Sequence, residues 1–400
     1  MSISQKVQKG MEEGSWIRRM FEEGALLKQR YGKENVFDLS LGNPVMEPPV
    51  EFVQELRKLA EQPLPGMHRY MENAGYPETR AAVAAQLSLD IGIEFTFKDI
   101  IMTCGTSGAL NILLKAILDE GDEVIIFAPY FVEFANFIGN HGGVTRILPS
   151  DEQFVPRVDV METAIGPRTK AVIINSPNNP TGVVYGEDIL HQMGELLRKK
   201  EAQYGTQIFL ISDEVYRKII YDGLKFQPPL HHHPQSIIVT SHSKDLALMG
   251  ERIGYIAVNP GCSQKEELMD SLVFCNRVLG YANAPALMQH IVRHLQQVPA
   301  PVAEYQKSRD FLYDNLTKMG YSLIKPQGAF YMFPESPLED DVAFVRELKE
   351  LKVLTVPGRG FGAPGYFRIS YCVDEQTLEG SLAGFQKAAQ KFNLQKAQLY

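Results

Sequence analysis

Five short apolar runs set the strongest limit on how this chain can fold. They are continuous rather than alternating and rich in isoleucine and valine: EVIIFA (123–128), AVIIN (171–175), IFLIS (208–212), SIIVT (236–240) and GYIAV (254–258). Such runs are typical of strands buried on both faces, as in a parallel sheet covered by helices. They predict an α/β protein, a three-layer α/β/α domain around a mostly parallel sheet.

Segments with helical apolar spacing separate these runs, as a parallel sheet requires. The clearest are ALNILLKAIL (109–118) and EDILHQMGELLRKK (187–200). Another helix, SWIRRMFEEGALLKQRYG, is expected to stop at Gly32, and NVFDLSLGNP predicts a short strand with a turn. A long helix over about 286–318 leads into GAFYMFP, VLTVPG, YFRISY and a final helix.

This change of pattern predicts a second, smaller α+β domain to which the start of the chain returns. The expected division is an N-terminal segment of the small domain (1–51), a large domain (52–290) and the C-terminal small domain (291–400).

Composition excludes several classes of function. The 400 residues carry a net charge of −8 without a basic stripe, so nucleic acid is not an expected partner. The four cysteines form no CxxC pair, and the run of His231, His232 and His233 favours a solvated loop over a metal site. The polar N-terminus and the lack of an apolar run of about 18 residues predict a cytoplasmic protein without a membrane span.

Chemically active side chains follow four of the predicted strands. Phe131 follows the first run and Asn179 the second, Asp213 and Tyr216 follow the third, and Lys244 follows the fourth. Ligands of open parallel sheets bind beyond the carboxyl ends of the strands, so these side chains are expected on one rim.

This set suits pyridoxal 5'-phosphate. The Lys244 amine can form a Schiff base with its aldehyde, and Asp213 can keep the pyridine nitrogen protonated. Asn179 and Tyr216 can donate hydrogen bonds to the ring oxygen, and Phe131 can stack on the ring.

The phosphate needs backbone amides at the start of a helix. CGTSGA (104–109) opens a predicted helix in this way, so Gly105 lies in the expected nest and Ser107 adds a hydroxyl. Arg252 and either Ser241 or Ser243 are the further expected donors.

The motifs SPNNPTG, SDEVY, SHSKxxxxxGERIGY and FRIS, in this order from about Asp38 to Phe385, resemble the class I and II aminotransferases of the fold-type-I pyridoxal-phosphate enzymes. The resemblance implies transfer of an amino group between an L-amino acid and a 2-oxo acid, with Lys244 as Schiff-base lysine and proton shuttle. It implies the same roles for Asp213, Asn179 and Tyr216. It assigns Thr106, Ser107 and Arg252 to the phosphate. The substrate is assigned to Arg368, which holds the α-carboxylate, with Gly42 and Asn179 beside it. Tyr70 would reach the phosphate of the neighbouring subunit, which implies a homodimer with shared active sites.

For some single residues, a purely structural role remains as an alternative. Asp213 could cap a helix starting at Glu214, and the Asn179 segment could be only a turn. Buried Arg368 needs an anion, either an internal acid or a substrate carboxylate. GRGFG (358–362) lacks the spacing of a dinucleotide loop.

Departures from the family pattern remove no chemistry but suggest a less common branch of the family. Glu251 and Thr79 replace apolar residues of the family. Where some dicarboxylate-specific members have an arginine, this chain has Val278, with Arg277 beside it.

Trp16 and Ile17 lie in the segment that covers the substrate side chain in the family, and suggest an apolar or aromatic amino donor. Two other functions share the cofactor: a C–S or β-lyase or an amino acid decarboxylase, and a regulator that binds DNA.

Overall fold

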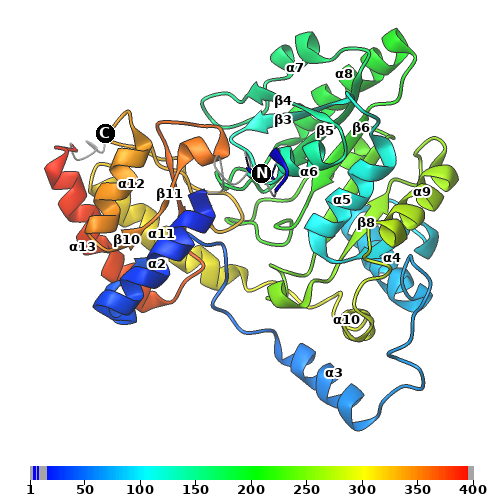
Figure 1. Cartoon of the computed structure of the whole chain (residues 1–400), viewed down its shortest axis with the longest axis horizontal. Coiled ribbons are helices and arrows are strands. Elements are labelled where there is room, and N and C mark those ends of the chain that lie inside the picture. Colours follow the sequence, from blue (N-terminus) through cyan, green and yellow to red (C-terminus); the bar gives the residue numbers. More distant parts are fainter. Residues whose placement is uncertain (1–2, 6, 9–15, 395–400) are drawn as a thin grey trace.

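The computed structural model describes residues 3–5, 7–8 and 16–394. Two lobes are visible in Figure 1, one around β3, β5, β6 and β8 and the other around β10 and β11. Within the described part of the chain, no helix is long and apolar enough to cross a membrane.

The first lobe is built on a seven-stranded sheet of order β2-β8-β7-β6-β5-β3-β4. The strands from β7 to β4 in this order are parallel, and β8 is antiparallel to both of its neighbours. This confirms the predicted fold class. The strand bounds are β2 Ile100–Thr103, β3 Glu123–Ala128, β4 Val144–Pro149, β5 Thr169–Asn175, β6 Phe209–Asp213, β7 Ser236–Ser241 and β8 Gly254–Val258.

Neighbouring residues of one strand belong to opposite faces of the sheet. On β3, Val124 and Ile126 pack into one apolar cluster, whereas Ile125 and Phe127 pack into another. The first cluster includes residues of α5 and α9, and the second includes residues of α7 and α8. Because side chains alternate across a strand, both faces are covered by helices, which explains why the runs are continuously apolar.

The helices of this lobe start and stop close to the predicted bounds. The expected helices over 109–118 and 187–200 are α5 and α8. Their full set is α3 Val50–Glu61, α4 Pro77–Ile91, α5 Gly105–Ile117, α6 Phe134–Asn140, α7 Val158–Ala164, α8 Glu187–Tyr204, α9 Lys265–Val278 and α10 Ala286–Val292.

One predicted helix is wrong. The expected helix over 286–318 is interrupted, because α10 ends at Val292 and α11 begins only at Val302. Pro299 and Pro301 lie in the interruption, where their missing N–H groups and fixed φ disfavour a continuous helix.

The second lobe combines the two ends of the described chain. The strand β1 pairs in parallel with β10, and β11-β12-β9 form an antiparallel sheet. Helix α2 ends before Gly32, as predicted. The elements are α2 Trp16–Tyr31, β1 Phe37–Asp38, α11 Val302–Lys318, β9 Tyr331–Met332, α12 Asp341–Glu350, β10 Val353–Leu354, β11 Val356–Pro357, β12 Phe367–Ser370 and α13 Glu375–Lys391. The bounds of the domains themselves stay a prediction.

Candidate active site

A cavity of about 270 Å³ lies beyond the carboxyl ends of the parallel strands. Every residue that the sequence analysis placed in the site lines this cavity, except Gly105 and Tyr70. Side chains from the ends of β5, β6 and β7 meet there with residues of α5 and β12. The strand order explains this convergence, since β5, β6 and β7 are parallel neighbours in the sheet.

Lys244 follows β7 and directs its amine into the cavity. Its Nζ donates a hydrogen bond to the carbonyl of Gly42 at 2.5 Å and lies 5.6 Å from the centre of the Phe330 ring. Burial lowers the pKa of this amine to about 8, and the positive charges of Arg368 and Arg252 act in the same direction. A larger share of the amine is therefore neutral and nucleophilic near neutral pH than for an exposed lysine.

Asp213 is the last residue of β6 and is buried, and among the described residues no cation forms an ion pair with it. The contact found for its carboxylate is a long one, 3.4 Å from the Val215 N–H to Oδ1. No helix begins at Glu214, so the capping alternative does not hold. Burial raises the pKa of Asp213 to about 7, and the neighbouring Glu214 carboxylate adds to the rise. A cationic ligand at this point would restore the ionised form.

Asn175, which the sequence analysis missed, connects Asp213 with Asn179. Its Nδ2 donates to the Asp213 carbonyl at 3.0 Å, and its Oδ1 accepts from the Asn179 N–H at 2.8 Å. The loop after β5 is a turn, and its Asn175 contact fixes the direction in which Asn179 leaves it. The last letter of AVIIN was the available signal, because a polar residue closing a buried strand needs a partner.

Arg368 on β12 is 2% exposed and lies between two rings, 4.6 Å from that of Tyr331 and 4.8 Å from that of Phe361. It donates from Nη1 to Asn179 Oδ1 at 3.0 Å and from Nη2 to the Ser40 carbonyl at 2.6 Å. Its Nε has no partner, and no carboxylate of the described residues forms an ion pair with it. The internal-acid alternative therefore finds no support within the described chain.

The start of α5 forms a cradle for an anion. Gly105 has φ of +70°, and a Cβ there would lie 3.0 Å from Arg252 Nη2. The buried hydroxyl of Thr106 has no hydrogen-bond partner in the part of the chain that the structure describes. Ser241 Oγ donates to Ser243 Oγ at 3.1 Å at the same end of the cavity. Free amides, an unused hydroxyl and a guanidinium are the groups that bind phosphate.

Two phenols lie together on the wall of the cavity. The hydroxyls of Tyr216 and Tyr331 are hydrogen-bonded at 2.9 Å, and a Cβ on Gly42 would lie 1.9 Å from Tyr331 Oη. Tyr331 was missed by the sequence analysis, since the run GAFYMFP gives no spacing that separates it from core aromatics.

Phe131 and Tyr70 differ in their placement. Phe131 is partly exposed on the cavity wall and packs edge-on against Phe134, with ring centres 5.5 Å apart. Tyr70 is 92% exposed and does not line the cavity of its own chain.

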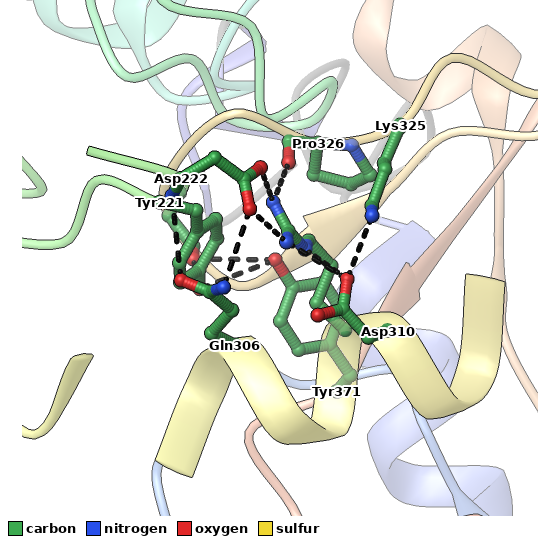
Figure 2. A network of polar contacts seen from close by, with 9 residues as sticks. Tyr221, Asp222, Gln306, Asp310, Lys325, Pro326 and Tyr371 are labelled. Atoms are coloured by element: carbon green, nitrogen blue, oxygen red, sulfur yellow. Dashed lines mark hydrogen bonds and ion pairs between the residues drawn. The ribbon is translucent and has the colours of Figure 1, made fainter. Parts of the chain in front are cut away.

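A polar network around the buried Arg309 holds the segment that carries Tyr331 (Figure 2). Arg309 of α11 donates to both carboxylate oxygens of Asp222, at 2.6 and 2.9 Å, and to the Pro326 carbonyl at 2.9 Å. Tyr221 and Tyr371 both donate to the carbonyl of Ala329, two residues before Tyr331. The network joins the chain beyond β6 to α11 and to the start of β9.

The residues that depart from the family pattern do not line the cavity. The buried Thr79 hydroxyl donates to the Gln289 carbonyl at 3.0 Å, and Glu251 is exposed. Val278 and Arg277 are exposed at the end of α9 and do not line the cavity. The side chains of Trp16 and Ile17 lie outside the described residues.

The three neighbouring histidines do not converge. His231 Nε2 contacts the Ile91 carbonyl at 2.8 Å, whereas the buried His233 contacts that of Ile208 at 2.9 Å. Across the described ranges, no group of side chains is arranged to hold a metal ion.

Comparisons with known proteins agree on one family. The sequence model for aminotransferase class I and II matches residues 34–384. An aspartate/prephenate aminotransferase of Thermus thermophilus is 34% identical over 91% of this chain and 93% of its own. The aromatic-amino-acid aminotransferase 2 of Thermococcus litoralis is 31% identical over 98% of this chain and 100% of its own.

Solved structures give the same answer. The crystal structure of an aminotransferase from Eubacterium rectale has a TM-score of 0.94 and 38% identity, covering 98% of this chain and 100% of its own. The aspartate aminotransferase of Thermus thermophilus with maleate has a TM-score of 0.87 and 29% identity, with coverage of 97% and 100%. The chain therefore belongs to the class I and II aminotransferases, a family of pyridoxal-phosphate enzymes that move an amino group between an amino acid and a 2-oxo acid.

Proposed function

We propose that this chain binds pyridoxal phosphate as a Schiff base with Lys244 and transfers amino groups at that site. One observation carries the proposal: within the described chain, polar groups that have no hydrogen-bond partner or only a long one converge on one cavity beside an activated amine. They are the Asp213 carboxylate, the Thr106 hydroxyl and Arg368 Nε. Unsatisfied buried polar groups are costly, so such a set indicates a ligand with matching groups.

Each part of the cofactor has a partner in this scheme. Asp213 binds the pyridine nitrogen, whose positive charge lowers the raised pKa of this carboxyl. Asn179 and Tyr216 bind the ring oxygen, and Phe131 packs on the ring face.

The phosphate is bound at the start of α5. Gly105, Thr106 and Ser107 contribute the helix end, and Arg252 contributes a guanidinium. Arg252 has φ of +54°, a left-handed conformation that costs free energy and that functional sites often retain. Ser241 and Ser243 contribute hydroxyls.

The residues around the amine account for the proton transfers. Arg368 holds the substrate α-carboxylate, with Gly42 beside it, so that the Cα–H bond lies within reach of Lys244 Nζ. When bound, pyridoxal phosphate supplies an electron-poor ring that stabilises the negative charge left by loss of the Cα proton. With the cofactor bound, the free Lys244 amine would remove that proton as general base and then return it as general acid.

We also propose that the amino donor carries an uncharged, apolar or aromatic side chain. Among the described residues, the cations that line the cavity are Lys244, Arg252 and Arg368, and the scheme uses all three. No further cation remains for a side-chain carboxylate within one described chain. Relatives include enzymes named for aspartate and for aromatic amino acids. A direct comparison of these amino donors with this protein therefore tests the proposed side-chain class.

The exposure of Tyr70 supports a homodimer with shared active sites. A side chain that is 92% exposed can reach the phosphate of a neighbouring subunit, as the family resemblance implies. The location in the cytoplasm stays a prediction.

Borohydride reduction followed by peptide mapping tests the cofactor. The reduced cofactor is expected on Lys244, and Lys244→Ala should abolish labelling, while Lys225→Ala, which alters an exposed lysine, should not. An unmodified Lys244 in cofactor-saturated protein would refute the proposal.

A donor panel tests the reaction and the side-chain class. Phenylalanine, leucine and aspartate are each supplied with 2-oxoglutarate, and glutamate formation is measured. Cysteine, which carries a sulfur leaving group on Cβ, is supplied in parallel. Release of pyruvate, ammonia and sulfide from cysteine without glutamate would indicate a lyase, and carbon dioxide from any donor a decarboxylase. A clear preference for aspartate would refute the donor proposal alone.

A further inference from the structure

The pair of Tyr216 and Tyr331 holds one more hydroxyl proton than it uses. Their oxygens are 2.9 Å apart and form one hydrogen bond, in which either could be the donor. Burial raises the pKa of Tyr331 to about 12 and that of Tyr216 well above its ordinary value, so both phenols stay protonated at neutral pH. Two O–H groups and one mutual bond leave one donor free.

The free donor points to a ligand in the cavity. The two tyrosines are 4% and 2% exposed, both line the cavity, and the mutual bond is the hydrogen bond found for either hydroxyl among the described residues. A buried hydroxyl whose donor is unused costs free energy, so a ligand acceptor is expected here.

The surroundings indicate which phenol holds the ligand. Tyr331 Oη lies against the backbone of Gly42, and the Arg368 guanidinium covers its ring at 4.6 Å. The carbonyl contacts of Ala329 fix the preceding turn, where φ is +56°. Tyr331 is thus held in place by contacts on several sides, as expected of a residue that orients the neighbouring Tyr216 hydroxyl.

We propose that Tyr331 is a positioning residue: it donates its hydroxyl proton to Tyr216 and so commits the Tyr216 hydroxyl to donate to the ring oxygen of pyridoxal phosphate. This inference rests on the proposed function. Hydrogen bonds in such a chain polarise one another, so Tyr216 becomes the stronger donor because Tyr331 donates to it.

The expected effect is on the protonation of the Schiff base. The ring oxygen attracts the Schiff-base proton, and a hydrogen bond donated to that oxygen reduces the attraction. Without Tyr331 the donor is weaker, the proton is held more tightly, and its loss requires a higher pH. The shift for Tyr331→Phe should be upward by about 0.3 to 1 pH unit, which corresponds to a neutral hydrogen bond or part of one.

The experiment is a pH titration of the Schiff-base absorbance in the cofactor-loaded protein, without substrate. Tyr216→Phe should shift the midpoint upward more than Tyr331→Phe, and the double variant should match Tyr216→Phe alone. Tyr305→Phe is the matched control, because the Tyr305 hydroxyl is also buried, has no hydrogen-bond partner within the described ranges and does not line the cavity. It should leave the titration unchanged.

Titration of apoprotein with pyridoxal phosphate gives a second measurement. Tyr331→Phe should weaken cofactor binding by about twofold to fivefold. An unshifted titration in folded Tyr331→Phe, or shifts that add in the double variant, would overturn the inference. If the wild-type protein forms no Schiff base at all, the proposed function fails instead, so the two failures are distinguishable.

Discussion

Arg368 and Asn179 are 189 positions apart in the chain, and Nη1 of the arginine donates to Oδ1 of the asparagine at 3.0 Å. This bond connects β12 of the second lobe to the turn that follows β5 of the large sheet. The substrate carboxylate site and the cofactor site therefore share one amide side chain.

Arg368→Gln tests the carboxylate site. The variant should lower kcat/KM for the amino donor by about 10- to 100-fold, mainly through KM, because charge-assisted hydrogen bonds are lost. Cofactor affinity should change little. Arg346→Gln, on the exposed face of α12, is the control and should behave as wild type. Equal losses in both variants would argue against a substrate role.

Asp213→Asn tests the buried carboxyl in the apoprotein. The folded pKa, about 7, exceeds the ordinary value of 3.8, so between these values the native state binds more protons than the unfolded state. The free energy of unfolding should therefore fall as pH rises from about 4 to about 7. Burial also raises the pKa of Glu214 to about 7, so that residue contributes in the same window.

The variant should reduce this dependence without abolishing it, and it should stabilise the apoprotein at neutral pH. Urea unfolding at several pH values measures both effects. Cofactor binding should weaken, because the amide cannot neutralise a pyridinium. An apoprotein destabilised at pH 7 by Asp213→Asn would contradict the assignment.

Gly42→Ala should disturb Tyr331. The added Cβ would lie 1.9 Å from Tyr331 Oη, so the phenol or the segment must move. Overpacking of this kind costs about 1–3 kcal/mol. We expect a moderate loss of thermal stability together with a large loss of transaminase activity. The control is Gly166→Ala, where an added Cβ meets no atom within 4 Å. If this control loses as much activity as Gly42→Ala, the clash with Tyr331 is not the cause of the loss.

The Arg309 network should respond unequally to the loss of either charge. The Arg309 side chain is fully buried, whereas that of Asp222 is 48% exposed. Asp222→Ala leaves a buried guanidinium with fewer acceptors and should cost about 2 kcal/mol. Arg309→Met keeps apolar contacts and leaves a carboxylate that water can solvate, so its cost should be smaller.

Urea unfolding of the two variants measures which one loses more free energy of unfolding. Lys307→Met, which breaks an exposed pair with Glu375, should change the free energy of unfolding by less than about 1 kcal/mol. The reverse order of Asp222→Ala and Arg309→Met would show that packing outweighs charge in this network.

The sequence predicted the parts of the fold that depend on local pattern. Continuous Ile and Val runs located five strands, because both faces of those strands are covered. The edge strand β4 was missed, since most of its residues are exposed or partly exposed and it carries no continuous apolar run. β2, a strand of four residues, was too short to recognise.

The residues of the candidate site also fall into a group that local pattern predicts and a group that it does not. Lys244, Asp213 and Asn179 follow strands of the sheet, so their convergence could be inferred from topology. Tyr331 and the carbonyls of Ser40 and Gly42 reach the cavity from the second lobe. Their placement depends on long-range packing, including the Arg309 network, which no local spacing encodes.

Ser40 and Gly42 give the site a property that neither lobe has alone. One short stretch supplies a carbonyl to Arg368 and another to Lys244, the groups assigned to the α-carboxylate and to the Cα proton of an amino acid. A displacement of this stretch would loosen both anchors together. A ligand that shifts these three consecutive residues on binding Arg368 would therefore also change the acceptor offered to the Lys244 amine.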